Sequence, residues 1–400
     1  MIRNTLLTLA LICATTPAIA RGDISAAIGA DGLARTEADL AAMPAPDAND
    51  LFALGGVRFL RAVERALQAR FQYGMSGRTM DVPVLRLEVA ENPAAEPFYP
   101  ELIQEIFAGV ISDMALAKEP LAAISADANV AVRIDLGDLW FDINMNDARD
   151  NGEGLAELAA GTIIPRRFGN SDKTTPPVIQ FDTSDVAWLQ AYTHFLSGLS
   201  EMVLAYPPAS AIERVLKSAG EMRTLVGDAP PTNAFDHLFS TEADLAMMVY
   251  LALQQPPQAE HTRAARRHFL EMIRLNRNFW AALDTETDND AEWIPNARQT
   301  SALGVRMPAE TGEAWLAILQ DAEDLLEGRK LVPHWRYGSQ AGVNLKRLLE
   351  NPVPVNLAEW AQGMGLLPYA EKGQRIGTFN WRNFTRMMRG ESMLYVILLN

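Results

Sequence analysis

The sequence predicts an α+β protein that is predominantly helical, with a small antiparallel sheet in its N-terminal half. Apolar residues recur at helical spacing through most of the chain from Asp182 onward. Alternating apolar and polar residues, which are typical of strands, occur only in the first half. Hydrophobic residues make up 48% of the 400 residues, which is enough for a large buried core.

The first 20 residues have the pattern of a cleavable signal peptide. Arg3 supplies a positive charge, residues 6–13 form an apolar run too short to span a bilayer, and residues 18–20 place small side chains where a signal peptidase cleaves. We therefore expect an exported protein, periplasmic or secreted. Cys13 is the only cysteine, so the mature chain has neither disulfides nor thiolate metal ligands.

Residues 21–50 are rich in Ala, Asp, Gly and Pro, and this composition predicts a flexible leader. The folded part is expected to begin near Leu51. Four apolar residues at helical spacing follow it: Leu60, Val63, Leu67 and Phe71. Their spacing predicts a helix with one buried face.

Strands are predicted in the segments 82–89, 130–146 and 178–181. In the second segment two alternating runs are joined by Gly137-Asp138. A two-residue turn of this kind between alternating runs predicts a hairpin over residues 130–146.

From Asp182 onward the pattern is helical. Asp182, Thr183 or Ser184 is expected to cap a helix that runs to about Leu204. Further helices are predicted at 209–226, 241–254, 259–283, 310–328 and 378–390.

Residues 227–233, which contain Gly, Asp and two Pro, are the best candidate boundary. They would separate an α+β region (51–230) from a mainly helical region (231–400). One continuous domain over 51–400 is the alternative.

The negative net charge limits the possible partners, and the absence of catalytic motifs favours a non-catalytic role. Thirty-five Lys and Arg against 50 Asp and Glu give a net charge of −15, which argues against nucleic acid and anionic membranes as main partners. No metalloprotease, serine-hydrolase, phosphate-loop or dinucleotide motif is present, and no segment is long and apolar enough to span a membrane. We expect an exported protein that binds a ligand or associates with the envelope.

Two basic segments are candidate surfaces for an anionic ligand or a protein partner. One is the arginine-rich face of the helix 259–283, and the other is the stretch 372–389, which has five basic residues and no acid. A solvated face is the alternative for the first, and an amphipathic helix that closes the core is the alternative for the second.

The alternative function is a hydrolase that uses carboxylates as acid and base. Its candidate residues are His194 with Asp142, Asp182 and Asp185. His194 belongs to a polar stripe on an otherwise apolar helix, made of Gln190, His194, Ser197 and Glu201. The stripe is either the solvent-facing edge of the helix or one wall of a cavity.

Two acidic loops are candidate calcium sites. Side-chain oxygens occur in residues 142–153 at the spacing of a calcium loop, in Asp142, Asn144, Asn146, Asp150 and Glu153. Asp147 departs from this pattern, because its position normally requires Gly. The second loop has acids on alternate residues from 284 to 292, and Asp288 and Asp290 lie at its centre. A plain solvated acidic turn is the alternative for both loops.

The C-terminal third resembles a group of secreted bacterial proteins of unknown function. The resemblance lies in residues 288–300, 325–336 and 343–347, the second of which reads LLEGRKLVPHWR. It covers at most residues 284–400 and implies a secreted bacterial origin. It implies no fold, activity or ligand.

Overall fold

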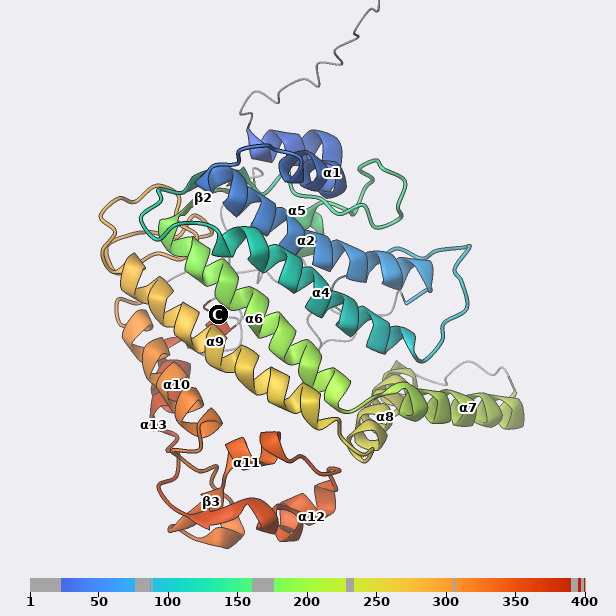
Figure 1. Ribbon diagram of the computed structural model, residues 1–400. Helices are drawn as coiled ribbons and strands as arrows, with labels where there is room; N and C mark the ends of the chain where they lie inside the picture. The colour runs from blue at the N-terminus through green and yellow to red at the C-terminus, as the bar shows by residue number, and fades with distance from the viewer. Residues whose placement is uncertain are drawn as a thin grey trace, which may run out of the picture.

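The computed structural model describes residues 23–75, 87, 89–159, 176–227, 234–304, 307–389, 395–396 and 399, with the backbone alone at 159, 226 and 234–241 (Figure 1). In these residues the protein is predominantly helical and has two small antiparallel sheets of two strands each. The predicted fold class is therefore confirmed.

The elements have the following bounds. The α-helices are α1 (Ile24–Ala41), α2 (Ala48–Gln72), α4 (Leu102–Ala122), α5 (Leu155–Ala159), α6 (Thr183–Ala205), α7 (Ala209–Val226), α8 (Ala234–Leu253), α9 (Ala259–Leu283), α10 (Thr311–Leu326), α11 (Leu345–Glu350), α12 (Leu357–Gln362) and α13 (Phe379–Met387). The 3-10 helices are η1 (Trp335–Tyr337) and η2 (Met364–Tyr369), and the strands are β1 (Ala131–Asp135), β2 (Val178–Asp182), β3 (Ala341–Val343) and β4 (Ala370–Lys372).

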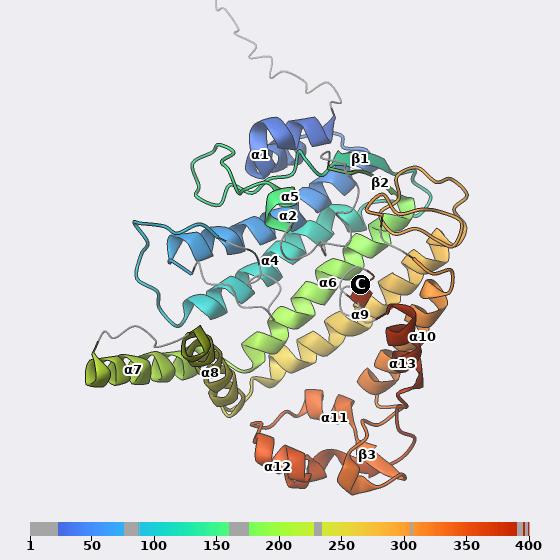
Figure 2. The same ribbon diagram turned by 180° about the vertical axis from the view of Figure 1, so that it is seen from behind.

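Four long helices, α2, α4, α6 and α9, lie side by side and form the centre of the molecule (Figures 1 and 2). Helix α1 and the β1–β2 sheet lie at one end. A C-terminal lobe, residues 331–377, lies at the opposite end and contains η1, β3, α11, α12, η2 and β4.

Helices α6 and α9 pack against each other along their lengths. Gly198 of α6 faces the ring of Phe269, and a Cβ atom at Gly198 would lie 2.7 Å from that ring. The absence of a side chain therefore lets the two helices approach, and Phe279 of α9 is fully buried in the core beside them.

The predicted flexible leader is wrong from residue 24 onward, because those residues form α1 and the start of α2. The carboxylate of Asp23 caps α1 by accepting hydrogen bonds from the N–H groups of Ser25 and Ala26. Ile28 and Leu33 are buried in the core. Alanine favours helix strongly, and the few large apolar residues of this segment are enough to anchor it.

The predicted hairpin over 130–146 is also wrong in its pairing. Strand β1 pairs antiparallel with β2, with Ala131 opposite Asp182. The start of the second alternating run instead bonds to residues 153–155, where Phe141 donates to Glu153 O and Leu155 donates to Leu139 O, and the chain turns from residue 143 onward. The alternation of apolar and polar residues indicates which face of a strand is buried, but it does not identify the strand with which it pairs.

Both edges of the β1–β2 sheet are covered. On the outer edge of β1, the N–H groups of Ala131 and Asp135 donate to the side chains of Asn49 and Ser25, each at 2.8 Å. On the outer edge of β2, the N–H of Gln180 donates to Ala291 O at 2.9 Å. The loop after α9 is thereby attached to the sheet.

The helices predicted from residue 182 onward are confirmed, and α6 and α9 match the predicted segments closely. Helix α4 and the β3–β4 sheet of the C-terminal half were not predicted. The signal peptide, most of the predicted strand 82–89 and most of the predicted boundary 227–233 lie outside the described residues. In the part of the chain that is described, no helix has the length and apolar character needed to cross a membrane.

Candidate metal centre

Three carboxylates from distant parts of the chain meet at the N-terminus of α6. Asp182, Glu286 and Glu292 each place one carboxylate oxygen within 4.8 Å of the others. Asp182 ends β2, and both glutamates lie in the loop that follows α9. Glu292 is buried, and the other two are partly buried. We call these three residues the acidic cluster.

Hydrogen bonds hold the loop after α9 in place and so fix the positions of the two glutamates of the acidic cluster. Gln180 binds Ala291 as described above, and the N–H of Ala302 donates to Glu292 O at 2.8 Å. The side chain of Asn296 donates to Leu283 O, also at 2.8 Å, and so ties the loop to the end of α9. These bonds hold Glu286 and Glu292 next to the end of β2.

Asp182 and Asp185 form a capping box at the start of α6. The Asp182 carboxylate accepts from the N–H of Ser184 at 2.8 Å, and the Asp185 carboxylate accepts from the N–H of Asp182 at 3.0 Å. Asp185 is buried directly behind the acidic cluster. Both residues therefore help to cap α6, which is the role that the sequence predicts for Asp182.

The electrostatics of the acidic cluster favour a bound positive charge. Burial, with the neighbouring charge of Asp182, raises the pKa of Glu286 to about 7. Burial likewise raises the pKa of Asp185 well above its usual value and raises that of Glu292. Among the described residues no Lys or Arg forms an ion pair with the cluster, and Arg298 donates to the backbone oxygen of Glu286 instead. The fold therefore favours the protonated form of Glu286 and Glu292, whereas a bound cation would favour the ionised form.

The predicted ligands Asp288 and Asp290 do not belong to the acidic cluster. Asp290 is exposed, and its nearest cation is the Arg133 guanidinium at 3.9 Å. The members that converge are Glu286 and Glu292, which flank the two aspartates in the same alternating run. The sequence predicts a loop dense in acids, but it does not predict which of them converge. That depends on where the two ends of the loop are bonded to the rest of the fold.

The other predicted loop, residues 142–153, is closed by its own hydrogen bonds. The Asp142 carboxylate accepts from the N–H groups of Asn146 and Asp147, and the Glu153 carboxylate accepts from those of Ile143, Asn144 and Asp150. The side-chain amides of Asn144 and Asn146 both donate to the Asp150 carboxylate.

Asp147 adopts the conformation that this loop position requires. Its φ is 58°, in the left-handed region that Gly usually occupies and that Asp tolerates. Asp142, Asp150 and Glu153 nevertheless do not gather as the acidic cluster does, which is the one such group found among the described residues. Among the described residues, three carboxylates therefore converge in the acidic cluster and not in this loop.

The residues of the predicted hydrolase are not brought together. His194 lies about 13 Å along α6 from Asp185, by helix rise alone. Its ring nitrogen Nδ1 is 2.9 Å from Nδ1 of His268 on α9. Asp142 is engaged in its own loop. No described carboxylate of this set lies where it can work with His194.

The polar stripe of α6 faces α9 rather than solvent. His194 contacts His268, Glu201 contacts His261, and Ser197 is buried. Leu199, which belongs to the apolar remainder of the helix, is 40% exposed. Of the two alternatives for the stripe, the solvent-facing edge is therefore wrong. The polar residues lie at the interface between the two central helices, because their partners on α9 are polar as well.

The histidine pair is expected to make the fold sensitive to acid. Burial, with the charges of Lys118 and His268, lowers the pKa of His194 to about 4, and burial and Lys118 lower that of His268. Glu271 and Arg274 of α9 also face His194, with opposing effects. The neutral rings are favoured in the fold, so stability should fall as the pH drops from about 6.5 towards 4.

Urea denaturation at pH 7 and pH 4.5 measures this loss. The double substitution His194→Gln and His268→Gln should raise the free energy of unfolding at pH 4.5 relative to that at pH 7, compared with wild type, whereas His334→Gln, in the C-terminal lobe, should leave this difference unchanged. An equal pH dependence in all three proteins would contradict the assignment to this pair.

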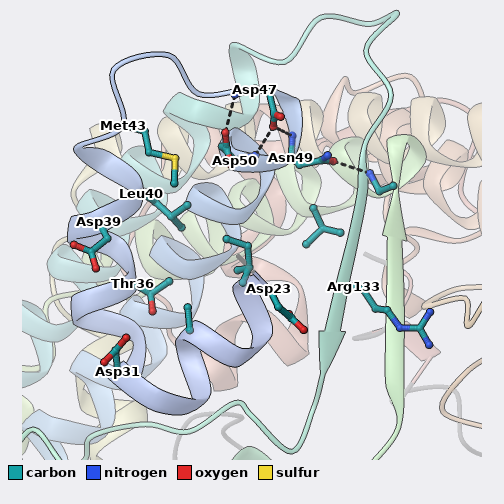
Figure 3. Close-up of a pocket in the computed structure, with 14 residues that line it drawn as sticks. Asp23, Asp31, Thr36, Asp39, Leu40, Met43, Asp47, Asn49, Asp50 and Arg133 are labelled. Atoms are coloured by element: carbon teal, nitrogen blue, oxygen red, sulfur yellow. Dashed lines mark hydrogen bonds between the residues drawn. The ribbon is translucent and has the colours of Figure 1, made fainter. Parts of the chain in front are cut away.

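A cavity of about 440 Å³ lies between α1, the start of α2 and β1 (Figure 3). Its lining includes Asp23, Asp31, Asp39, Asp47 and Asp50. Asp23, Asp47 and Asp50 cap helices, and Asp39 pairs with Arg35. The placement of these four residues therefore has a structural explanation that needs no ligand, and we assign none to this cavity.

No protein-family model, curated protein or solved structure matches this chain.

Proposed function

We propose that this chain is an exported, non-catalytic protein that binds a divalent cation, calcium in the first instance, at the acidic cluster. The convergence of Asp182, Glu286 and Glu292 without a paired Lys or Arg among the described residues is the observation that carries the proposal. The signal-peptide pattern of residues 1–20 supports export, as does the resemblance of the C-terminal third to secreted proteins.

The donor set suits a hard cation. Carboxylate oxygens are the preferred ligands of Ca²⁺, which takes six to eight oxygen ligands and tolerates irregular geometry. The absence of His and Cys from the acidic cluster disfavours zinc, which prefers nitrogen and sulfur. Water would complete the coordination on the partly exposed side of Asp182 and Glu286.

The affinity should be modest. A carboxyl with a pKa near 7 is half protonated at neutral pH, so calcium must displace a proton to bind. We expect a dissociation constant of roughly 0.1–1 mM, in the range of extracellular calcium modules.

Isothermal titration of the chelator-treated protein with CaCl₂ at pH 8 tests the proposal. Wild type should bind one calcium ion, and Glu286→Gln with Glu292→Gln should abolish binding. The matched control, Asp142→Asn with Glu153→Gln in the other predicted loop, should leave binding unchanged. Loss of binding in the control alone would move the site to residues 142–153, and absence of binding to wild type would overturn the proposal.

A further inference from the structure

The C-terminal lobe exposes an apolar edge that the packing of the lobe does not use. In a 3-10 helix, side chains three residues apart lie one above the other. In η2 the pair Leu366 and Tyr369 is buried in the small core of the lobe, whereas Met364 and Leu367 are 59% and 63% exposed. The two exposed side chains therefore share one outer edge of the helix.

Trp335 extends this edge. It is 72% exposed, and its Nε1 donates to Ala361 O at 2.9 Å, which holds the ring beside the segment that leads into Met364. The neighbouring Tyr337 donates to Gly363 O and fixes the same segment from η1. We call Trp335, Met364 and Leu367 the apolar edge.

Basic side chains lie beside Trp335 and in the segment that follows η2. The guanidinium of Arg336 lies 4.5 Å from the centre of the Trp335 ring. Lys372 is exposed, and Arg375 donates to Gly338 O, one residue beyond η1. No ion pair holds any of these three cations in the described part of the chain. Of the nearby acids, Glu371 is paired with Arg347, and Glu359 accepts a hydrogen bond from Asn356.

This concentration of charge departs from the rest of the protein. The lobe, residues 331–377, contains five Arg and Lys and three Glu, whereas the whole chain has 35 basic and 50 acidic residues. The arginines of α9 are engaged differently: Arg266 pairs with Glu327, and Arg277 pairs with Glu323. The free cations of the lobe thus remain available to a partner.

We propose that the apolar edge and its cations dock the C-terminal lobe onto an anionic lipid surface. Tryptophan is favoured at the interface between water and lipid, and Met364 and Leu367 lose exposed apolar area on insertion. Each basic residue near an anionic surface strengthens binding by roughly fivefold. Acidic residues elsewhere, beyond a screening length of about 8 Å at physiological salt, oppose this docking only weakly.

Flotation with lipid vesicles tests the proposal. The purified protein is mixed with vesicles of phosphatidylglycerol and phosphatidylcholine, or of phosphatidylcholine alone. EDTA is present throughout, so that a calcium bridge cannot contribute and the result is independent of the proposed cation site. Wild type should partition at least tenfold more strongly to the anionic vesicles at 50 mM NaCl, and this preference should shrink at 500 mM NaCl.

Three variants separate the contributions. Met364→Ser with Leu367→Ser, and Arg336→Glu with Lys372→Glu, should each weaken partition at least tenfold. Met222→Ser with Leu225→Ser removes equally exposed apolar side chains from α7 and should change nothing. Thermal melts confirm that each variant is folded. Equal partition to both kinds of vesicle, or an equal loss in the α7 control, would overturn the proposal.

Discussion

Replacing Phe279 with alanine is expected to lower the free energy of unfolding by about 3–5 kcal/mol. Phe279 is fully buried on α9, and its ring contacts that of Trp280 edge to face, with centroids 5.3 Å apart. Because α9 lies against α6 in the centre of the molecule, the surrounding side chains can fill the resulting cavity only in part.

Urea denaturation of the two proteins measures this change. Leu199→Ala on α6 is the matched control, because Leu199 is 40% exposed. Its loss should be no more than about 1 kcal/mol. Equal losses at the two positions would mean that the helices pack differently from the arrangement in Figures 1 and 2.

The stabilisation by calcium is expected to increase with pH. Glu286 has a higher pKa in the folded protein, about 7, than its usual value of 4.5, so the fold favours the protonated form. Without a cation, this contribution to stability is complete below pH 4.5 and is lost as the pH rises through about 7. Calcium binds the deprotonated carboxylates and should therefore restore the loss at pH 8 but have little effect at pH 5.

At pH 8, calcium at about ten times its dissociation constant should stabilise the wild type by about 1.4 kcal/mol. Glu286→Gln should remove both this response and the loss of stability of the chelated protein at high pH, because the amide stays neutral. Thermal melts with calcium and with sodium at equal ionic strength measure both effects. A calcium response of equal size at pH 5 and pH 8 would show that the acidic cluster does not bind the ion.

These carboxylates and the histidine pair act in opposite directions. Protonation of His194 and His268 destabilises the fold as the pH falls from about 6.5 towards 4, whereas ionisation of Glu286 destabilises it as the pH rises from about 4.5 to about 7. Because these two pH ranges overlap, the opposing effects should largely offset each other in the chelated protein. Substitution of the histidines should leave a stability that falls as the pH rises, and substitution of Glu286 should leave one that rises with pH.

Helix positions followed from the sequence more reliably than strand pairing. The segment 259–283 is predicted and observed with the same bounds, since its apolar face repeats over many turns. The partner of β1 could not be predicted in this way. Leu139, Phe141 and Ile143 are buried as their alternation indicates, although Met145 at the end of the run is exposed and Trp140 between them is buried. Hydrogen-bond partners depend on the path of the chain around them.

Only part of the acidic cluster could be predicted from the sequence. Asp182 was predicted as a helix cap, and residues 284–292 were predicted as an acidic loop. Nothing in the two segments indicates that they meet, because the contact between Gln180 and Ala291 joins positions more than 100 residues apart. The same holds for the stripe on α6, whose polar partners, His261 and His268, lie on another helix.

The covered edges of the β1–β2 sheet have a consequence for solubility. A two-stranded sheet ordinarily presents two rows of unpaired backbone groups, and these can pair with a strand of another molecule and begin aggregation. Here Ser25 and Asn49 occupy donors along one row, and the loop that carries Glu292 occupies the other at Gln180. The loop that supplies two of the three clustered carboxylates thus also shields a strand edge, and detaching it would expose that edge to neighbouring chains.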